Sequence, residues 1–188
     1  MTANDGTVVV VPLKSFDTGK SRLRAAMSGD LVHDLIMKLA RGVVAAAEGF
    51  RTVIVSDNAK VEFWAREMGC ECISGAEGLN QSLLAARQRL AAECERLVIV
   101  HGDIWEPASL SILPTDYEIV IAPDRHNQGT NVLSLPSQLD FHFSYGLRSA
   151  LAHEKEARRH GLTPLVLGTN SWGVDIDTTD DLNFAQLQ

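Results

Sequence analysis

The stretch that decides the fold is Thr7-Val8-Val9-Val10-Val11-Pro12-Leu13, an unbroken apolar run rich in β-branched residues. A strand with one solvated face alternates apolar and polar residues, whereas a strand buried on both faces is continuously apolar. Strands of the second kind lie in the centre of largely parallel sheets that helices cover on both sides. The run therefore predicts a central strand of an α/β fold.

Outward from this run, similar patterns recur along the chain. Further strands are expected at residues 52–55, 70–73, 97–100, 118–122, 131–135 and 164–167. Helices are expected at residues 30–48, 60–68, 79–93, 148–160 and 178–187. Strands that alternate with helices over short connections form βαβ units. The sequence thus predicts one α/β domain over residues 1–188, with a doubly wound, mostly parallel (mixed) sheet and helices on both faces.

Composition excludes several classes of protein. The 188 residues correspond to about one domain. With 24 acidic and 17 basic side chains the formal charge is −7, which argues against general nucleic-acid binding, because that requires a surplus of Lys and Arg on one face. Cys70, Cys72 and Cys94 have neither a zinc spacing nor a disulfide framework, so we expect reduced packing residues.

The N-terminal residues 1–5 contain no basic stretch followed by an apolar core, so no secretion leader is expected. The longest apolar runs are far shorter than the ~20 residues that span a bilayer. A cytoplasmic protein with no membrane partner is therefore expected. Any anionic ligand must be held by a local basic site or by a metal.

An acidic residue stands where a ligand site is expected. Ligands of doubly wound sheets bind beyond the carboxyl ends of the strands, and Asp103 follows the apolar run at 97–100. Mg²⁺ binds one or two carboxylates together with phosphate oxygens of a substrate, and Asp103 is a candidate for such a ligand. The other interpretation is that Asp103 caps a helix opened by Pro107.

A second acidic group lies far along the chain. Asp175 and Asp177 share one face of an extended segment and complete the set of metal candidates. Asp177 or Thr178 is expected to cap the last helix, with Asp180 or Asp181 near its positive end. Asp175 is therefore the better candidate for the metal.

The loop after the first strand is basic. Lys14, Lys20 and Arg22 lie there, and the two lysines are suited to neutralise charge on a triphosphate as pyrophosphate leaves. The sequence Gly19-Lys20-Ser21 lacks the first glycine of a P-loop, so that motif is rejected. The alternative interpretation is a solvated surface loop.

Further polar residues follow other predicted strands or open helices. Ser56 follows the second strand, and Asn80 and Ser82 open a helix after Gly78, where they could contact a base or phosphate. An ordinary helix N-terminus is the alternative for the latter pair.

The segments at 123–131 and 146–149 could hold a small anion. Asp124, Arg125 and Thr130 lie in a polar turn just after a buried strand. At a helix start, Gly146, Arg148 and Ser149 offer amides, a cation and a hydroxyl to a phosphate or carboxylate. A plain surface turn is the other interpretation of the first segment.

Several enzyme classes are excluded. The six histidines show no H-E-x-x-H spacing, and neither G-x-S-x-G nor a dinucleotide glycine fingerprint is present. The sequence thus argues against a zinc hydrolase, an α/β-hydrolase and a nicotinamide oxidoreductase. Trp64, Trp105 and Trp172 are either core residues or part of a subunit contact, which would make the chain a homodimer.

Taken together, these residues resemble a known family. The matching segments are 11–14 (VPLK) with 20–23 (KSRL), 78–80 (GLN), 102–103 (GD), 123–126 (PDRH) with 129–131 (GTN), and 175–178 (DIDT) with 181–182 (DL). They are similar to the guanylyltransferases of deazaflavin coenzyme biosynthesis, which use 2-phospho-L-lactate or phosphoenolpyruvate. The ordered match runs from residue 8 to about residue 184.

The resemblance implies a GT-A-like nucleotidyltransferase that uses GTP, Mg²⁺ and a small phosphorylated three-carbon acid. The acid's phosphate would attack the α-phosphorus of GTP, and pyrophosphate would leave. By position, Asp103 and Asp175 match the metal-binding aspartates, and Lys20 matches a phosphate-contacting lysine. Thr130, Gly146 and Ser149 match the positions that hold the carboxylate of the acceptor.

The sequence departs from the family at two places. His101-Gly102 replaces a small or proline residue and an alanine before Asp103, and Arg148 replaces the second glycine of a G-x-G-S turn. The acceptor and the base are therefore left open: 3-phosphoglycerate as acceptor, or another nucleotide as in cytidylyl- or molybdopterin-type enzymes, are alternatives. A catalytically silent nucleotide-binding module is the alternative of another class.

Overall fold

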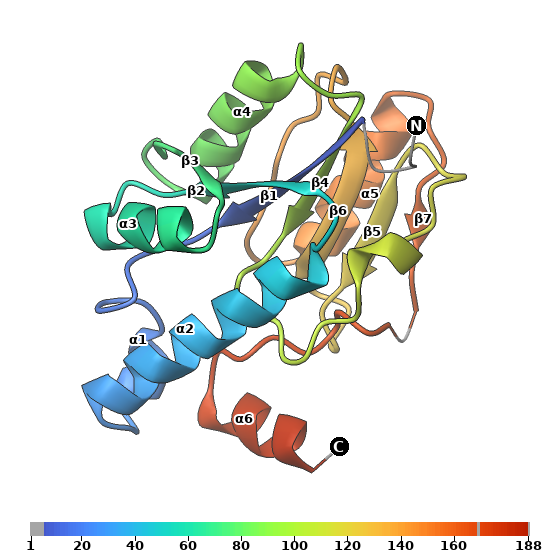
Figure 1. Cartoon of the computed structure of the whole chain (residues 1–188). Coiled ribbons are helices and arrows are strands. Elements are labelled where there is room, and N and C mark those ends of the chain that lie inside the picture. The colour runs from blue at the N-terminus through green and yellow to red at the C-terminus, as the bar shows by residue number, and fades with distance from the viewer. Residues whose placement is uncertain (1–5, 169, 188) are drawn as a thin grey trace.

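The computed structural model describes residues 6–168 and 170–187, in which strands and helices alternate (Figure 1). Residues 1–5, on which the expected lack of a leader depends, lie outside the described residues. The strands are β1 (Thr7–Pro12), β2 (Arg51–Val55), β3 (Glu71–Ile73), β4 (Arg96–Val100), β5 (Val120–Pro123), β6 (Thr130–Pro136) and β7 (Leu165–Val166). The helices are α1 (Ser21–Arg24), α2 (Gly29–Ala46), α3 (Ala59–Glu67), α4 (Leu79–Leu90), α5 (Ser149–Arg159) and α6 (Thr179–Gln186), with a 3-10 turn at Leu110–Ile112.

The seven strands form one sheet in the order β3-β2-β1-β4-β6-β5-β7. β1 pairs in parallel with β2 on one side and with β4 on the other, whereas β6 runs antiparallel to both β4 and β5. The chain therefore moves outward from β1 to β3 and then returns to the other side of β1. This reversal creates a crevice beyond the carboxyl ends of β1 and β4, and the predicted doubly wound, mixed sheet is confirmed.

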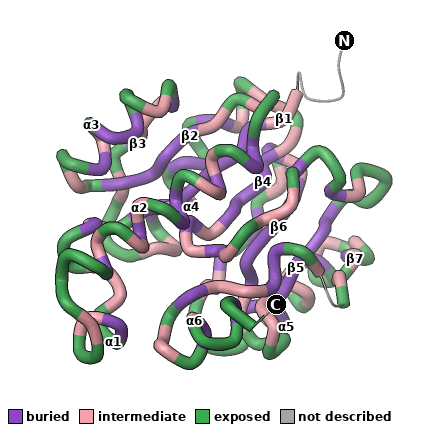
Figure 2. Tube along the Cα trace, turned by 60° about the horizontal axis from the view of Figure 1, so that its bottom comes forward, coloured by how far each residue is buried: buried purple, intermediate pink, exposed green. Residues whose placement is uncertain are grey.

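Both faces of the sheet are covered, as the alternation of side chains in β1 requires. Val9 and Val11 face a core shared with α2 and α3, while Val8 and Val10 face a core shared with α4. All four valines are at most 2% exposed. Figure 2 shows the buried strands between helices whose outer sides are exposed. The continuous β-branched run thus produced the expected central strand.

Some element ends differ from the sequence-based expectation. The strand expected from residue 70 begins at Glu71, because the Cys70 amide donates to the Ala65 carbonyl and completes the turn after α3. The alternative of a helix opened by Pro107 is wrong. After Asp103 the chain instead forms an isolated antiparallel bridge between Ile104 and Asp175.

Two tryptophans belong to the core, since Trp64 is 5% and Trp172 4% exposed. Trp105 is partly buried and packs against the same core, with Lys38 Nζ 4.7 Å from its ring centroid. Of the helices in the described part of the chain, none has the length and apolar character needed to cross a membrane.

Candidate active site

Lys20 joins the basic loop after β1 to an acidic rim at the edge of the sheet. We use this name for Asp103, Asp175 and Asp177. β1 ends at Pro12, and the following loop brings Lys20 into a left-handed conformation (φ 57°) at the start of α1. Its Nζ donates to Asp103 Oδ2 and, at 2.5 Å, to Asp177 Oδ1. Burial alone would lower the pKa of Lys20, but the charges of Asp103 and Asp177 outweigh it and raise that pKa to about 12. Lys20 is therefore held as a cation at the rim.

Arg24 fixes the shape of the loop that carries Lys20. Its guanidinium donates to three backbone carbonyls: Gly19 at 2.8 Å, Gly29 at 3.1 Å and Phe16 at 2.5 Å. Hydrogen bonds from a charged donor are about twice as strong as neutral ones. Because two of the three carbonyls belong to the loop itself, Arg24 restricts the backbone immediately before Lys20.

A second tether attaches the same loop to two helices. The Asp17 carboxylate bonds Lys60 of α3 at 2.7 Å and His33 of α2 at 3.2 Å. Within the loop, Ser15 Oγ accepts from the amides of Asp17 and Thr18. The loop is thus preorganised by the protein before any ligand binds.

Asp103 lies directly beyond β4. The preceding Gly102 packs against Leu13, the residue after β1, and an added Cβ would clash with Leu13 Cδ2. Burial, the largest single influence, would raise the pKa of Asp103, but the charge of Lys20, its hydrogen bond and the nearby His101 together outweigh burial and hold that pKa below its usual value. Asp103 Oδ1 is buried and has no hydrogen-bond partner among residues 6–168 and 170–187. One carboxylate oxygen thus engages Lys20 while the other is left for a ligand.

Asp175 is brought to the same rim through the backbone. The Trp105 amide donates to the Val174 carbonyl at 2.7 Å, and the Ile176 amide donates to the Asp103 carbonyl at 3.0 Å. The Asp175 carboxylate accepts from Asn131 Nδ2 at 3.3 Å. Burial, together with the nearby negative charge of Asp103, raises the pKa of Asp175 to about 6. The two aspartates, 72 positions apart, therefore share one electrostatic environment.

The C-terminal helix is capped beside this rim. Thr178 is the N-cap of α6, and its side chain forms a reciprocal capping box with Asp181. Asp177, which is the residue before the cap, directs its carboxylate to Lys20 and remains 52% exposed. The cap is therefore Thr178, which leaves the Asp177 carboxylate available at the rim.

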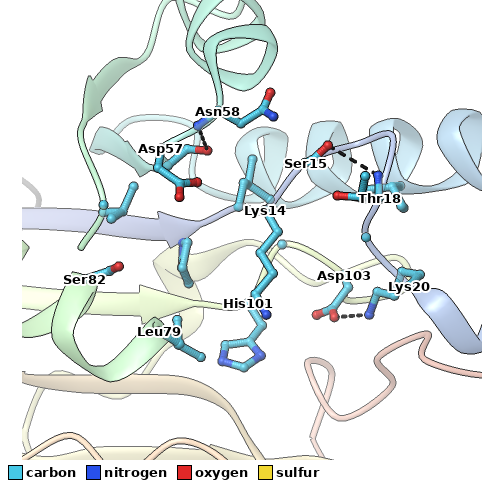
Figure 3. A pocket seen from close by; sticks show the side chains of 18 of the residues that line it. Lys14, Ser15, Thr18, Lys20, Asp57, Asn58, Leu79, Ser82, His101 and Asp103 are labelled. Carbon is cyan, nitrogen blue, oxygen red and sulfur yellow. Dashed lines mark hydrogen bonds and ion pairs between the residues drawn. The ribbon is translucent and has the colours of Figure 1, made fainter. Parts of the chain in front are cut away.

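A cavity of about 910 Å³ opens beside these residues (Figure 3). Its lining includes Lys14, Lys20, Arg22, Ser56, Ser82, Asp103 and Asp177 from the predicted site residues. Figure 3 shows the joined pair Lys20 and Asp103 toward one end and Ser82 toward the other, with Asp57 and Asn58 above. The cavity covers the ends of β1, β2 and β4, at the crevice that the topology creates.

The end of the cavity away from Lys20 is built from backbone. The Ser56 amide donates to the Ile73 carbonyl, and the Gly75 amide donates to the Ser56 carbonyl, so the loops after β2 and β3 are joined. Ser82 Oγ donates toward the Ala76 and Gly78 carbonyls at 2.9 Å and accepts from the Ala76 amide. Ser82 thus shapes the loop before α4.

Asn80 connects α4 to the segment before α5 and does not line the cavity. Its Oδ1 accepts from the Tyr145 amide at 2.7 Å, and its Nδ2 donates to the Tyr145 carbonyl at 3.2 Å. Both hydrogen bonds of the Asn80 side-chain amide thus go to the backbone of Tyr145. Asn80 therefore positions Tyr145 across 65 residues of sequence.

The predicted acceptor residues Thr130 and Ser149 are each 1% exposed and form a network with His153. Ser149 Oγ donates to Thr130 Oγ1 at 3.2 Å, and Thr130 Oγ1 lies 3.0 Å from His153 Nδ1. The Ser144 amide donates to His153 Nε2 at 3.1 Å, so that nitrogen carries no proton. Burial lowers the pKa of His153 to about 4, and the ring is therefore neutral.

The side chains of Asp124 and Arg125 stabilise the turn between β5 and β6. Asp124 accepts from the amides of His126, Gln128 and Gly129 at 2.7 to 2.9 Å. Arg125 donates to Asp181 at 2.6 Å and lies over the Phe184 ring at 4.6 Å. These two predicted substrate-binding residues thus tie the turn to itself and to α6.

Gly146 and Arg148 precede α5 and are exposed. Both have positive φ, at 132° and 58°, and Arg148 occupies the N-cap position in a left-handed conformation. Arg148 directly precedes Ser149, and the Ser149 hydroxyl bonds Thr130. This turn therefore leads into the network around Thr130. Neither residue lines the cavity of about 910 Å³.

The donor set fits a magnesium ion. Asp103 Oδ1 is buried without a partner in the described part of the chain, and such a charged atom is costly to leave unpaired. Among residues 6–168 and 170–187, no group of three or more His, Cys, Asp or Glu side chains is placed to hold a metal ion, so Asp103, Asp175 and Asp177 do not form a three-carboxylate site. Mg²⁺ characteristically binds to one or two carboxylates and to substrate phosphates rather than to such a site. Asp103 and Asp175 are the residues that would hold it.

Sequence reasoning did not find Arg24, since its partners are backbone carbonyls that carry no side-chain signal. Asn58 lines the cavity and was also missed, although it follows a buried strand. Its position two residues after Ser56 was the available signal.

The chain matches one protein family over almost its whole length. A family model described as guanylyl transferase CofC like matches residues 7–187. A phosphoenolpyruvate guanylyltransferase of Sphaerobacter thermophilus is 32% identical over 188 residues, covering 94% of this chain and 90% of the relative. A 2-phospho-L-lactate guanylyltransferase of Methanocaldococcus jannaschii is 29% identical, covering 93% of this chain and 80% of the relative.

Solved structures share the fold at lower identity. A protein described as a nucleotide-diphospho-sugar transferase from Desulfovibrio desulfuricans G20 aligns with a TM-score of 0.78 and 16% identity over 95% of this chain and 85% of that chain. A 4-diphosphocytidyl-2C-methyl-D-erythritol synthase from Anaerococcus prevotii aligns with a TM-score of 0.62 and 9% identity over 98% and 96%. These likenesses confirm the expected nucleotidyltransferase-type fold.

Proposed function

Since the chain belongs to the guanylyl transferase CofC-like family and is a nucleotidyltransferase, we propose that it transfers GMP from GTP to a small phosphorylated three-carbon acid. The acceptor is phosphoenolpyruvate or 2-phospho-L-lactate, and the reaction serves deazaflavin coenzyme biosynthesis. The observation that carries the proposal is the convergence of Lys20, Asp103 and Asp175 on one rim beside a cavity of about 910 Å³.

The two ends of the cavity suit different parts of the nucleotide. Lys14, Lys20 and Arg22 supply positive charge for the triphosphate at one end. The loops at Ser56 and Gly75, which are joined by their own hydrogen bonds, form a fixed wall beside the space for the base at the other end. Because bases are read through donors and acceptors at fixed positions, a rigid backbone wall is suited to select guanine.

The reaction is an in-line displacement at phosphorus. A phosphate oxygen of the acceptor forms a bond to the α-phosphorus of GTP, and the bond from that phosphorus to the bridging oxygen breaks. The electron pair leaves with pyrophosphate. Positioning and charge neutralisation account for most catalysis of this kind, so no side-chain nucleophile is required.

Lys20 is the protein group that neutralises charge on the phosphates. The preorganised loop keeps its ammonium at the rim, and its raised pKa keeps it protonated at neutral pH. Mg²⁺, when bound by Asp103 and Asp175 together with phosphate oxygens, supplies further neutralisation of the triphosphate. Lys14 and Arg22, both exposed at the cavity, contact the outer phosphates.

The test is a matrix of donors and acceptors. GTP, ATP, CTP and UTP are each incubated with phosphoenolpyruvate, 2-phospho-L-lactate or 3-phosphoglycerate, and pyrophosphate and the nucleotidyl product are measured. Turnover is expected with GTP and one of the first two acids, and it should be lost with EDTA and restored by Mg²⁺. Turnover only with 3-phosphoglycerate or with another nucleotide would replace the assigned substrate. Binding of GTP without pyrophosphate from any acceptor would indicate a silent binding module.

A further inference from the structure

His101 lines the cavity but takes no part in the contacts described so far. It follows β4 directly, and its backbone amide donates to the Asn131 carbonyl of β6 at 3.0 Å. Its ring lies against Tyr145 with a centroid distance of 5.0 Å and an interplanar angle of 30°. Figure 3 shows the ring between Leu79 and the Asp103 side of the cavity.

Two polar atoms of this pair are buried without a partner. Neither His101 Nε2 nor the Tyr145 hydroxyl has a hydrogen-bond partner in the described residues. Leaving a buried polar group unpaired costs free energy, so such groups in a folded protein call for an explanation. His101 lines the cavity and Tyr145, which is not part of the lining, packs against its ring, so a ligand that enters at His101 is the group available to satisfy these atoms.

The pair is also held in place from two sides, as a binding site must be. Asn80 clamps the Tyr145 backbone through its amide and carbonyl, at 2.7 and 3.2 Å. On the opposite side the Tyr145 ring meets the buried His153 ring edge to face, with centroids 4.7 Å apart. The Tyr145 ring therefore has little freedom to move away from the His101 ring that it packs against.

The position of His101 in the sheet indicates which substrate would bind beside it. The loops after β1, β2 and β3 supply the basic and backbone walls suited to the nucleotide. His101 lies on the other side of β1, at the end of β4 next to β6. An acceptor that attacks in line must approach the α-phosphorus from the side opposite the leaving pyrophosphate, and the β4–β6 side is the one left for it.

We propose that His101 is a specificity-determining residue that donates a hydrogen bond from Nε2 to the carboxylate of the acceptor, with the Tyr145 hydroxyl as a second donor. This inference rests on the proposed function. A neutral imidazole can donate from Nε2, and the Tyr145 hydroxyl stays protonated because burial raises its pKa. A carboxylate, which accepts several hydrogen bonds, satisfies both atoms at once.

The test compares His101→Ala, His101→Gln and Tyr145→Phe with His142→Ala, in which an exposed histidine is removed instead. His101→Ala is expected to raise the KM for the acceptor at least tenfold and to change the KM for GTP less than twofold. Tyr145→Phe should raise the acceptor KM about threefold to tenfold, and His101→Gln, which keeps a donor, should recover part of the loss. His142→Ala should behave as the unaltered protein.

Binding measured by calorimetry separates this inference from the proposed function. Phosphoenolpyruvate and 2-phospho-L-lactate are titrated into each variant after saturation with Mg²⁺ and a nonhydrolysable GTP analogue, and melting curves verify the fold. If the unaltered protein turns over but both His101→Ala and Tyr145→Phe bind acceptor normally, only this inference is overturned. If acceptor binding depends on His101 while no pyrophosphate forms, only the proposed function fails. A larger effect on GTP than on acceptor would assign His101 to the nucleotide and overturn the proposal.

Discussion

The two halves of the sheet use polar side chains in different ways. The parallel half consists of β1 to β4, and the other half contains the antiparallel β5–β6 hairpin. On the parallel half, Asp103 keeps one buried oxygen without a partner in the described chain, and Lys14 faces the cavity. On the half built from the β5–β6 hairpin, Asp124 accepts from three amides of its own turn, and Thr130, Ser149 and His153 bond one another. The comparison teaches that polarity after a strand marks a ligand site only where side-chain atoms remain unsatisfied by the protein.

The largest expected effect is on catalysis by the parallel half. Asp103→Asn removes the charge that faces Lys20 and the proposed metal, and we expect kcat for pyrophosphate release to fall at least a thousandfold with the fold intact. The exposed Asp116→Asn is the matched control and should retain full activity. If Asp103→Asn releases pyrophosphate at the normal rate, Asp103 is not a metal ligand.

A pH prediction addresses the hairpin half. The pKa of His153 is about 4 in the folded protein and 6.5 in the unfolded chain, so the unfolded state binds more protons as pH falls. Stability from His153 is thus complete above pH 6.5 and is lost toward pH 4. Between pH 7 and 5 the loss amounts to about 2 kcal/mol.

His153→Gln tests this loss, because a Gln amide can accept from the Ser144 amide and donate to Thr130 without titrating. Urea unfolding at pH 7 and 5 should show a drop in the free energy of unfolding that is about 2 kcal/mol smaller for this variant than for the unaltered protein. The same replacement at the exposed His142 should leave the drop unchanged. Equal drops in all three proteins would contradict a neutral His153.

Arg24→Gln tests the parallel half in another way. It removes the side chain that holds the loop before Lys20 and leaves the ligand-facing side chains in place. Loss of three charge-assisted bonds to carbonyls should lower the free energy of unfolding by about 2 kcal/mol and kcat by roughly tenfold to a hundredfold. Arg41→Gln on the exposed face of α2 is the control. Stopped-flow binding of GTP together with kcat would show the effect, and unchanged values for Arg24→Gln would mean that the loop holds its shape without it.

The smallest effect concerns the start of α5. Arg148 has φ 58°, a conformation that costs a non-glycine residue about 1 kcal/mol. Arg148→Gly should therefore raise the free energy of unfolding by up to about 1 kcal/mol, whereas Arg158→Gly within the same helix should lower it by about 1 kcal/mol. Chemical denaturation of both variants gives the comparison, and a loss of stability in Arg148→Gly would show that its side chain contributes contacts.

Much of the fold was predictable because its signals are local. β-branched runs such as Val8–Val11 and 97–100 marked strands buried on both faces, and both lie at the centre of the sheet. Asp103 and Lys20 were predicted as site residues because each follows a central strand. The short bridge that carries Asp175 to the rim could not be predicted, since it forms outside the regular strands and joins residues 71 positions apart.

The hairpin half was harder to interpret for a physical reason. A polar side chain after a strand has the same sequence signature whether its atoms bind a ligand or the backbone of its own turn. Asp124 is an example, because an Asp followed two residues later by amides in a tight turn commonly accepts from them. Only the hydrogen-bond partners in three dimensions separate the two cases.

The bond between Lys20 and Asp177 spans 157 residues of sequence. During synthesis, chains emerge and fold from the N-terminal side, so every strand of the sheet is made before Asp175 and Asp177 leave the ribosome. A nascent chain can therefore assemble the sheet, the basic loop and Asp103 while the other two aspartates of the acidic rim are still missing. Competence to react is the last property that this polypeptide acquires.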